Sequence, residues 1–272
     1  MWCVIRTIMD VAAGEELTID YTQEVVALQP VHVRRAALLR DKEFLCECPR
    51  CSAHGDDTRR FPCQAKECGG HHLVHQPTDA DEASLLPCSC CGAAAQTAYA
   101  ASLLRGESAL VSELRTTNEI IDSGRRIFVD VVSLIQRLKA PHHPHHHLAG
   151  EVARVKWELA RNVQQWGDAA EAKRAEIECR NAIVRIPRRD TAVCFGNLGD
   201  ALVAQAGASA SAQASVLLGE AQEAYQRALQ GLIFVLGPDH PWTGVAATKL
   251  AAVQARMLRS ASPLRRHTVG AP

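Results

Sequence analysis

Aromatic residues are scarce in this chain. Tryptophan, tyrosine and phenylalanine together make up 4% of its 272 residues, while 47% of the residues are hydrophobic and alanine and leucine dominate that fraction. Such a mixture favours helix over strand. The length suits one or two compact units.

An excess of either charge is also missing. Lysine and arginine number 30, and aspartate and glutamate also number 30, so the overall charge points to neither a nucleic acid nor an anionic membrane as a partner. No apolar run approaches the length that spans a bilayer, and residues 1–6 lack the basic region and apolar stretch of a secretory signal. We therefore expect a protein of the cytoplasm, the nucleus or both, without a membrane or nucleic-acid partner.

Cysteine, by contrast, is abundant and unevenly placed. Eight of the eleven cysteines lie between Cys46 and Cys91. Their spacings, C-x-C-x2-C followed by C-x4-C and C-x2-C, suit tetrahedral thiolate sites for zinc. A disulfide scaffold is the alternative, but such scaffolds belong to small secreted proteins, whereas this chain has a large helical remainder. We therefore expect Zn²⁺ bound by cysteines in this segment.

The hydrophobic pattern predicts an α+β fold that is mostly α-helical. Two short strands are expected at residues 3–9 and 16–21, and one helix at residues 31–41. Residues 46–96 are rich in Cys, Gly, His and Pro and show little apolar periodicity, so metal would replace a hydrophobic core there. From Thr97 onward the pattern is helical.

Several helices are expected in this second half. The apolar residues of 152–166 and 217–235 recur at steps of three and four residues, which marks one face of a helix. Gly237 would end the second of these helices, and Asp239 would cap the next one. A further helix is indicated between residues 121 and 138. Successive helices with short breaks predict antiparallel hairpins that stack side by side.

Three segments carry less information. Residues 204–215 alternate Ala, Ser, Gly and Gln, which predicts a flexible loop between helices. Residues 260–272 predict a disordered tail. The histidine-rich run at residues 141–148 suits the entrance of a helix better than a metal site.

Two motifs carry chemistry when they are taken together. The first is G-E-E-L-T-I-D-Y at residues 14–21, and the second is F-L-C-E-C-P-R-C at residues 44–51. Alone, the first could be any hairpin that ends in a surface tyrosine. Coupled to the second, it resembles the closing part of the SET domain and the post-SET segment of the SET/MYND (SMYD) protein-lysine methyltransferases.

This resemblance implies roles for particular residues. Tyr21 would be catalytic, because a tyrosine hydroxyl at this position holds the substrate lysine in line with the methyl group of S-adenosylmethionine. Phe44 would contact that cofactor. Cys46, Cys48 and Cys51 would bind one zinc ion, and the family's fourth ligand belongs to an N-H-x-C motif that this sequence does not contain.

The second group of cysteines resembles the zinc ribbon found after the post-SET segment in the arthropod msta-like branch of the same family. Its implied ligands are Cys63, Cys68, Cys88 and Cys91. Cys90 is an alternative to Cys91, with less suitable spacing. His71, His72 and His75 are nearby candidates for a swapped ligand, although solvated loop histidines are the favoured interpretation.

The helical half contains a less specific resemblance to a known motif. The run E-A-Y-Q-R-A-L at residues 223–229, followed by G-P-D-H-P at residues 237–241, resembles a tetratricopeptide hairpin in which Tyr225 fills the gap between hairpins. No clean 34-residue repeat extends across this half, so a generic helical domain stays open as the alternative.

Together these segments predict five parts along the chain. They are a C-terminal remnant of a SET domain at residues 1–22, a post-SET segment at 23–51, a zinc ribbon at 52–96, a tetratricopeptide-like helical domain at 97–259 and a disordered tail at 260–272.

The resemblance also implies a function. The family transfers methyl groups from S-adenosylmethionine to lysines of histones or other proteins, so a protein substrate or peptide partner is expected. The family's glycine-rich cofactor loop and MYND module have no counterpart in this sequence. We therefore expect a shortened chain that lacks the cofactor-binding half and is inactive by itself. The alternative is a non-catalytic, zinc-stabilised helical-repeat module for protein interaction.

Overall fold

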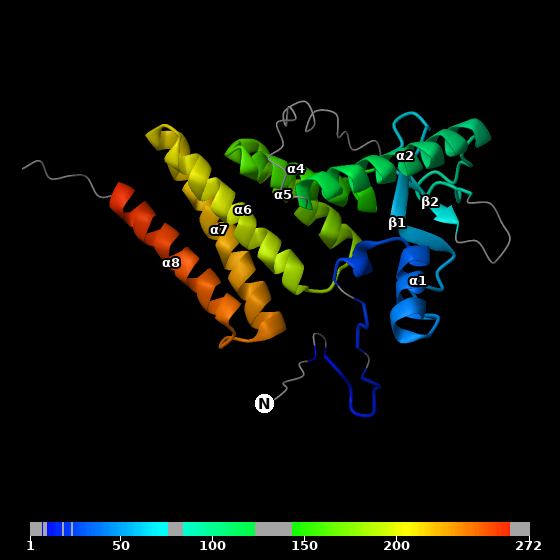
Figure 1. Cartoon of the computed structure of the whole chain (residues 1–272), viewed down its shortest axis with the longest axis horizontal. Helices are drawn as coiled ribbons and strands as arrows, with labels where there is room; N and C mark the ends of the chain where they lie inside the picture. Colours follow the sequence, from blue (N-terminus) through cyan, green and yellow to red (C-terminus); the bar gives the residue numbers. More distant parts are fainter. Residues whose placement is uncertain are drawn as a thin grey trace, which may run out of the picture.

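The computed structural model describes residues 7, 10–17, 19–22, 24–75, 84–122 and 143–261. Within these residues the fold is mostly helical, with seven α-helices and one two-stranded antiparallel sheet. The predicted α+β, mostly α-helical class is confirmed. Figure 1 shows the sheet and helix α1 at one end of an elongated molecule and helix α8 at the other.

Five helices lie side by side in chain order and form the larger part of the molecule (Figure 1). They are α4 (His147–Asn162), α5 (Trp166–Ile183), α6 (Arg189–Gly207), α7 (Ser211–Leu236) and α8 (Pro241–Ala261). Small residues at their contacts, such as the fully buried Ala160, Ala201 and Ala221, let neighbouring backbones approach closely. Tyr225 packs against Gly199, where an added Cβ would lie only 2.6 Å from the tyrosine ring.

Three helix boundaries differ from the sequence-based prediction. The helix expected at 152–166 ends at Asn162, because Gln164 adopts φ +60 and Trp166 begins α5. The loop expected at 204–215 is mostly helical, since alanine has the highest helix propensity, and only residues 208–210 connect α6 to α7. His240 rather than Asp239 caps α8, because its Nδ1 accepts the N–H of Trp242 at 3.2 Å.

Helix α2 (Thr97–Asp122) begins at the predicted residue and packs on α4. The contact is a small hydrophobic cluster of Leu110, Leu114, Leu148, Val152, Val155 and Leu159. The helix expected between residues 121 and 138 lies outside the described residues beyond residue 122, as do the segment 1–6 and the tail from residue 262 onward.

The two strands, β1 (Gly55–Pro62) and β2 (His71–His75), lie within the predicted zinc ribbon. They do not correspond to the strands expected near the N-terminus. The described residues of 16–21 form no strand, because no described neighbour pairs with their backbone, and most of 3–9 is outside the description. Phe61 and Val74 of the sheet are buried, so this segment has a small apolar centre of its own.

The sheet is joined to α1 (Val31–Lys42) and to the helical half by specific contacts. Asp56 of β1 accepts the N–H of Val31 at 2.8 Å and so holds the start of α1, which follows the short 3₁₀ helix η1 (Val26–Leu28). The Phe61 ring meets the ring of His146 at 5.0 Å, edge to face. The ribbon segment is therefore packed directly on the beginning of α4.

The described residues of the range 10–24, which we call the arm, reach the start of α6. Arg188 donates to Asp20 at 2.6 Å, and the N–H of Asp190 donates to the Glu24 carboxylate at 2.6 Å. The carboxylate of Glu24 thus satisfies an unpaired N–H in the first turn of α6. These contacts hold the arm, which includes Tyr21, at the start of α6.

Candidate metal centres and an adjoining cavity

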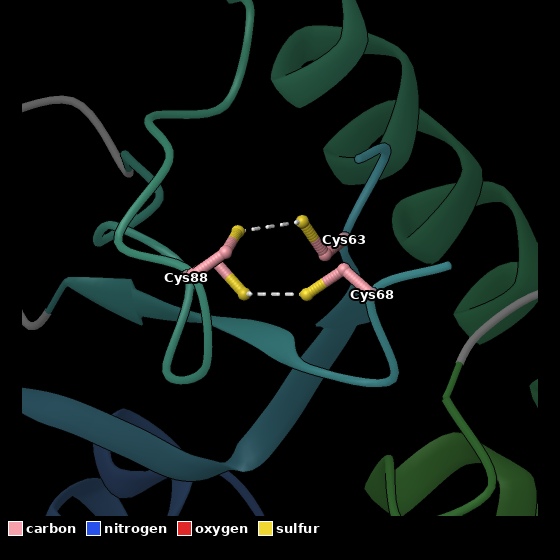
Figure 2. Close-up of side chains that lie close together, drawn as sticks. Cys63, Cys68 and Cys88 are labelled. Atoms are coloured by element: carbon pink, nitrogen blue, oxygen red, sulfur yellow. Dashed lines mark hydrogen bonds between the residues drawn. The ribbon is translucent and has the colours of Figure 1, made fainter. Parts of the chain in front are cut away.

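The four cysteines of the predicted ribbon meet at one point. Cys63 follows β1, Cys68 ends the next turn, and Cys88 and Cys91 belong to a tight turn after β2. All four sulfur atoms lie within 4.8 Å of one another. Figure 2 shows the side chains of Cys63, Cys68 and Cys88 directed toward a common centre.

The spacing of these sulfurs suits zinc rather than disulfides. The Cys63 and Cys91 sulfurs are 3.7 Å apart, as are those of Cys68 and Cys88. A tetrahedral zinc ion with Zn–S bonds of about 2.3 Å would separate its sulfurs by about 3.8 Å, whereas a disulfide needs about 2.05 Å. All four cysteines are free thiols in this structure. The cluster can therefore hold a zinc ion.

The backbone around Cys88 favours the thiolate form of this cysteine. The N–H of Cys90 lies 3.4 Å from the Cys88 sulfur, and backbone N–H groups of Cys91 and Cys90 lower the pKa of Cys88 to about 6. Gly70 lies so close that an added Cβ would be 2.7 Å from this sulfur. Gly92 takes φ +71, a conformation that favours glycine.

Cys90 and the ribbon histidines lie outside the cluster. The structure brings Cys91, not Cys90, to the other three sulfurs. His72 is buried and its Nδ1 lies 2.9 Å from the Leu86 carbonyl oxygen, whereas His71 contacts Ser89. The ring of His75 meets the ring of His54 edge to face, with centroids 4.4 Å apart. Among the described residues, none of these histidines joins a group of side chains that could hold a metal ion.

The cysteines of residues 46–51 form a second cluster. The sulfurs of Cys46, Cys48 and Cys51 lie within 4.8 Å of one another, so they too can hold a zinc ion. The N–H of Cys51 donates to the Cys48 carbonyl oxygen at 2.9 Å, which closes the turn. Burial raises the pKa of Cys51 to about 11 in the metal-free protein. Among the described residues no fourth ligand of a suitable kind joins this group.

A cavity of about 630 Å³ adjoins this second cluster. Its walls come from the arm, from α1, from the Cys46–Cys51 turn and, through Ile186 and Arg188, from the segment before α6. Tyr21 and Phe44 both line it, and their rings are in edge-to-face contact with centroids 5.7 Å apart. The structure thus brings together the two residues to which the resemblance gives catalytic and cofactor-binding roles.

The charges around this cavity are of two kinds. The arm contributes the exposed carboxylates of Asp10, Glu15 and Glu16. Arg50 and Arg188 also line the cavity, and each pairs with a carboxylate, of Asp57 and Asp20 respectively. Although burial opposes the shift, hydrogen bonds from Thr22 and the nearby Arg188 lower the pKa of Asp20. The exposed rim of the cavity is therefore acidic.

A third cluster was not predicted from the sequence. Glu107 of α2 lies 3.3 Å from Nε2 of His146 and 3.6 Å from Nε2 of His147, and all three side chains are buried. Arg59 of β1 also donates to the Glu107 carboxylate, with its Nε at 2.8 Å. The histidine-rich run gave the only signal in the sequence, and its predicted role at a helix entrance is confirmed because His146 caps α4.

The chemistry of this third cluster favours a structural role over metal binding. Nδ1 of His146 accepts the N–H of Leu148 at 3.1 Å, so its ring proton is on Nε2, the atom that faces Glu107. A metal at Nε2 would need that proton on Nδ1, where it would oppose the Leu148 N–H. The arginine and histidine donors together hold the pKa of Glu107 far below its usual range, despite burial. We interpret the group as a polar clamp between the ribbon and α2 and α4.

No helix in the described ranges combines the length and the apolar character needed to cross a membrane. No protein-family model matches the chain, and no curated protein matches it either.

Proposed function

We propose that this chain is related to the SET/MYND protein-lysine methyltransferases, and that Tyr21 and Phe44 form one wall of a methyl-transfer site. The supporting observation is the contact of these two rings inside the cavity that Cys46, Cys48 and Cys51 also line. The two zinc centres would hold the surrounding turns in place of a larger core.

The cavity fits part of such a site. S-adenosylmethionine would supply the methyl group when bound. The volume of about 630 Å³ lies within the range of roughly 300–1,000 Å³ typical of small-molecule sites. The Phe44 ring, which is 38% exposed, offers the flat apolar surface that an adenosyl group requires.

In this proposal Tyr21 acts on the lysine of the substrate. Its hydroxyl group would hydrogen-bond the neutral amine and orient the nitrogen lone pair, which is a positioning role rather than proton transfer. The acidic rim formed by Asp10, Glu15 and Glu16 would attract a peptide that carries lysine.

A second candidate function is supported by the exposure of Tyr21. Its side chain is 54% exposed, so the described residues do not close a narrow channel around it that would strip a lysine of water. Under this alternative the chain is a non-catalytic interaction module, in which zinc-stabilised turns and stacked helical hairpins present a surface to a partner protein.

One titration separates the two functions. If the cavity forms a working cofactor site in this chain, against the expectation that the cofactor-binding half is missing, S-adenosylmethionine titrated calorimetrically into the zinc-loaded chain should release heat, and Phe44→Ala should weaken binding by at least about tenfold. Tyr21→Phe should leave binding unchanged and lower methyl transfer. Phe234→Ala is the matched control, because Phe234 is similarly exposed but lies on α7. An absence of binding heat would reject the methyl-transfer site and favour the interaction module.

A further inference from the structure

Arg34 is a buried cation without a carboxylate partner. The residue lies in α1 and is only 3% exposed. Its Nη1 donates to the carbonyl oxygen of Gln29 at 2.6 Å, and its Nη2 lies 3.9 Å from the sulfur of Cys51. Within the described part of the chain it forms no ion pair with Asp or Glu, unlike Arg50 and Arg188 beside the same cavity.

Such a position requires an anion nearby. Transfer of a charged group from water into a protein interior is strongly unfavourable unless an opposite charge accompanies it. A guanidinium group does not lose its proton, so Arg34 remains charged. The group in contact with Arg34 that is able to become anionic is Cys51, which is itself only 4% exposed. The buried arginine thus requires an anion, and the buried thiol beside it is able to become one.

A zinc ion bound by the three cysteines would provide this anion. Metal binding removes the thiol protons, and three thiolates around Zn²⁺ carry a net charge of −1, which balances the single positive charge of Arg34. The neighbouring Arg35 donates to the carbonyl oxygen of Cys46 at 3.1 Å. Successive arginines of α1 therefore contact the first and the last cysteine of the turn.

We propose that Arg34 is the charge partner of a zinc centre at Cys46, Cys48 and Cys51, and that it positions Cys51 as a thiolate ligand. This inference rests on the zinc binding proposed for this cluster. The ribbon cluster of Cys63, Cys68, Cys88 and Cys91 has no contact with Arg34 among the described residues, so it should be independent of the arginine.

The first test measures zinc affinity in the full-length chain with a competing chelator. The wild-type chain should bind two zinc ions. Arg34→Met should keep the ribbon ion at unchanged affinity and lose about 10- to 100-fold in affinity at the three-cysteine cluster. Arg40→Met, on the same helix but with a largely exposed side chain, is the matched control and should change neither affinity. Wild-type affinity at the three-cysteine cluster of Arg34→Met would overturn the inference.

The second test separates a charge partner from a merely structural residue. Without zinc, Arg34→Met should leave the Tm unchanged or raise it, because an unpaired buried charge is removed. With zinc, the same variant should show a smaller gain in Tm than the wild type. An equal fall in Tm in both states would indicate packing alone and overturn the inference.

Arg34→Lys keeps the charge and covers the case in which Arg34→Met does not fold. It should retain most of the affinity of the three-cysteine cluster, and a loss of about tenfold or more would overturn the inference. A wild-type chain that binds zinc only at the ribbon would instead reject the proposed metal centre itself, so the two failures are distinguishable.

Discussion

At the scale of single residues, adjacent cysteines have different environments. Cys90 and Cys91 are neighbours, yet only the Cys91 sulfur reaches the ribbon cluster. The sequence favoured Cys91 because two residues separate it from Cys88, and this spacing lets both sulfurs of one turn face the same point. Local spacing is thus sufficient to predict which sulfurs of a single turn come together.

We expect Cys91→Ser to lower the zinc content by one ion per chain and to reduce the Tm, because a hydroxyl group is a poor substitute for a thiolate. Cys90→Ser is the control, since Cys90 is exposed and belongs to no described metal group, and it should keep full zinc content. Metal analysis after gel filtration measures both. Equal zinc loss in the two variants would show that the ligand assignment is wrong.

Glu107 is the residue whose importance the sequence could not reveal. It is one glutamate in a long amphipathic helix, and its partners Arg59, His146 and His147 come from two distant segments. Nothing in local periodicity or spacing marks it. Its role depends on how the ribbon packs against α2 and α4, which is a property of the tertiary structure alone.

We expect Glu107→Gln to destabilise the fold by about 3–5 kcal/mol, because it leaves the largely buried guanidinium of Arg59 without its anion. Urea unfolding followed by circular dichroism measures this change. Glu113→Gln is the control on the exposed face of the same helix and should change stability by less than about 0.5 kcal/mol. A similar effect of both variants would contradict the clamp.

At the scale of elements, the sequence predicted helices well and strands poorly. The apolar residues of α1 and α7 depend on local spacing, and α1 forms close to its predicted bounds, whereas α7 ends as predicted but begins at Ser211, inside the predicted loop. The strands at β1 and β2 lie in a segment with little periodicity, and their pairing has an irregular register between Asp56 and Arg60. Their formation depends on long-range closure, which a local pattern does not report.

The contact between β2 and the segment before α4 should make stability sensitive to pH. The rings of His71 and His143 lie 5.1 Å apart, near Arg60 and His145. Burial, together with these neighbouring positive groups, lowers the pKa of His71 and lowers that of His143 to about 4. Unfolding releases both histidines to ordinary values of about 6.5.

The direction in which stability changes with pH follows from proton binding. Between about pH 6.5 and pH 4 the unfolded chain binds more protons than the folded one, so stability should fall as the pH decreases through this window. Urea unfolding at pH 7.5, 6 and 5 measures the effect, and His143→Gln should flatten the dependence. His54→Gln, at an exposed ribbon position, is the control. A wild-type slope that His143→Gln leaves unaltered would contradict this origin.

At the scale of the whole molecule, two kinds of stabilisation divide the chain. The largest hydrophobic cluster contains buried residues only between Trp157 and Val253, so it is built by helices α4 to α8. The ribbon buries little apolar surface beyond Phe61 and Val74 and has four cysteines at one point. The helical part therefore has a core of its own, whereas we expect the ribbon, whose four cysteines can hold a zinc ion, to depend on metal and on its contact with α2 and α4.

Removal of zinc should consequently unfold one part of the molecule and leave the other. We expect a strong chelator to increase amide hydrogen exchange in β1 and β2 by large factors, because the cross-link between their turns is lost. Helices α6 and α7 should keep their protection, since their buried contacts are with α5 and α8. Mass spectrometry of peptic fragments before and after chelation measures both regions in one experiment.

The same experiment tests how tightly the two parts are coupled. Through Phe61 and the polar clamp, the ribbon contacts the first turn of α4 and the middle of α2. Intermediate loss of protection is therefore expected at these two helices, and it should be smaller in a Glu107→Gln chain, where the clamp is lost and the Phe61 contact remains. Uniform loss of protection through α7 would instead mean that the molecule unfolds as a single cooperative unit and that the metal centres stabilise all of it.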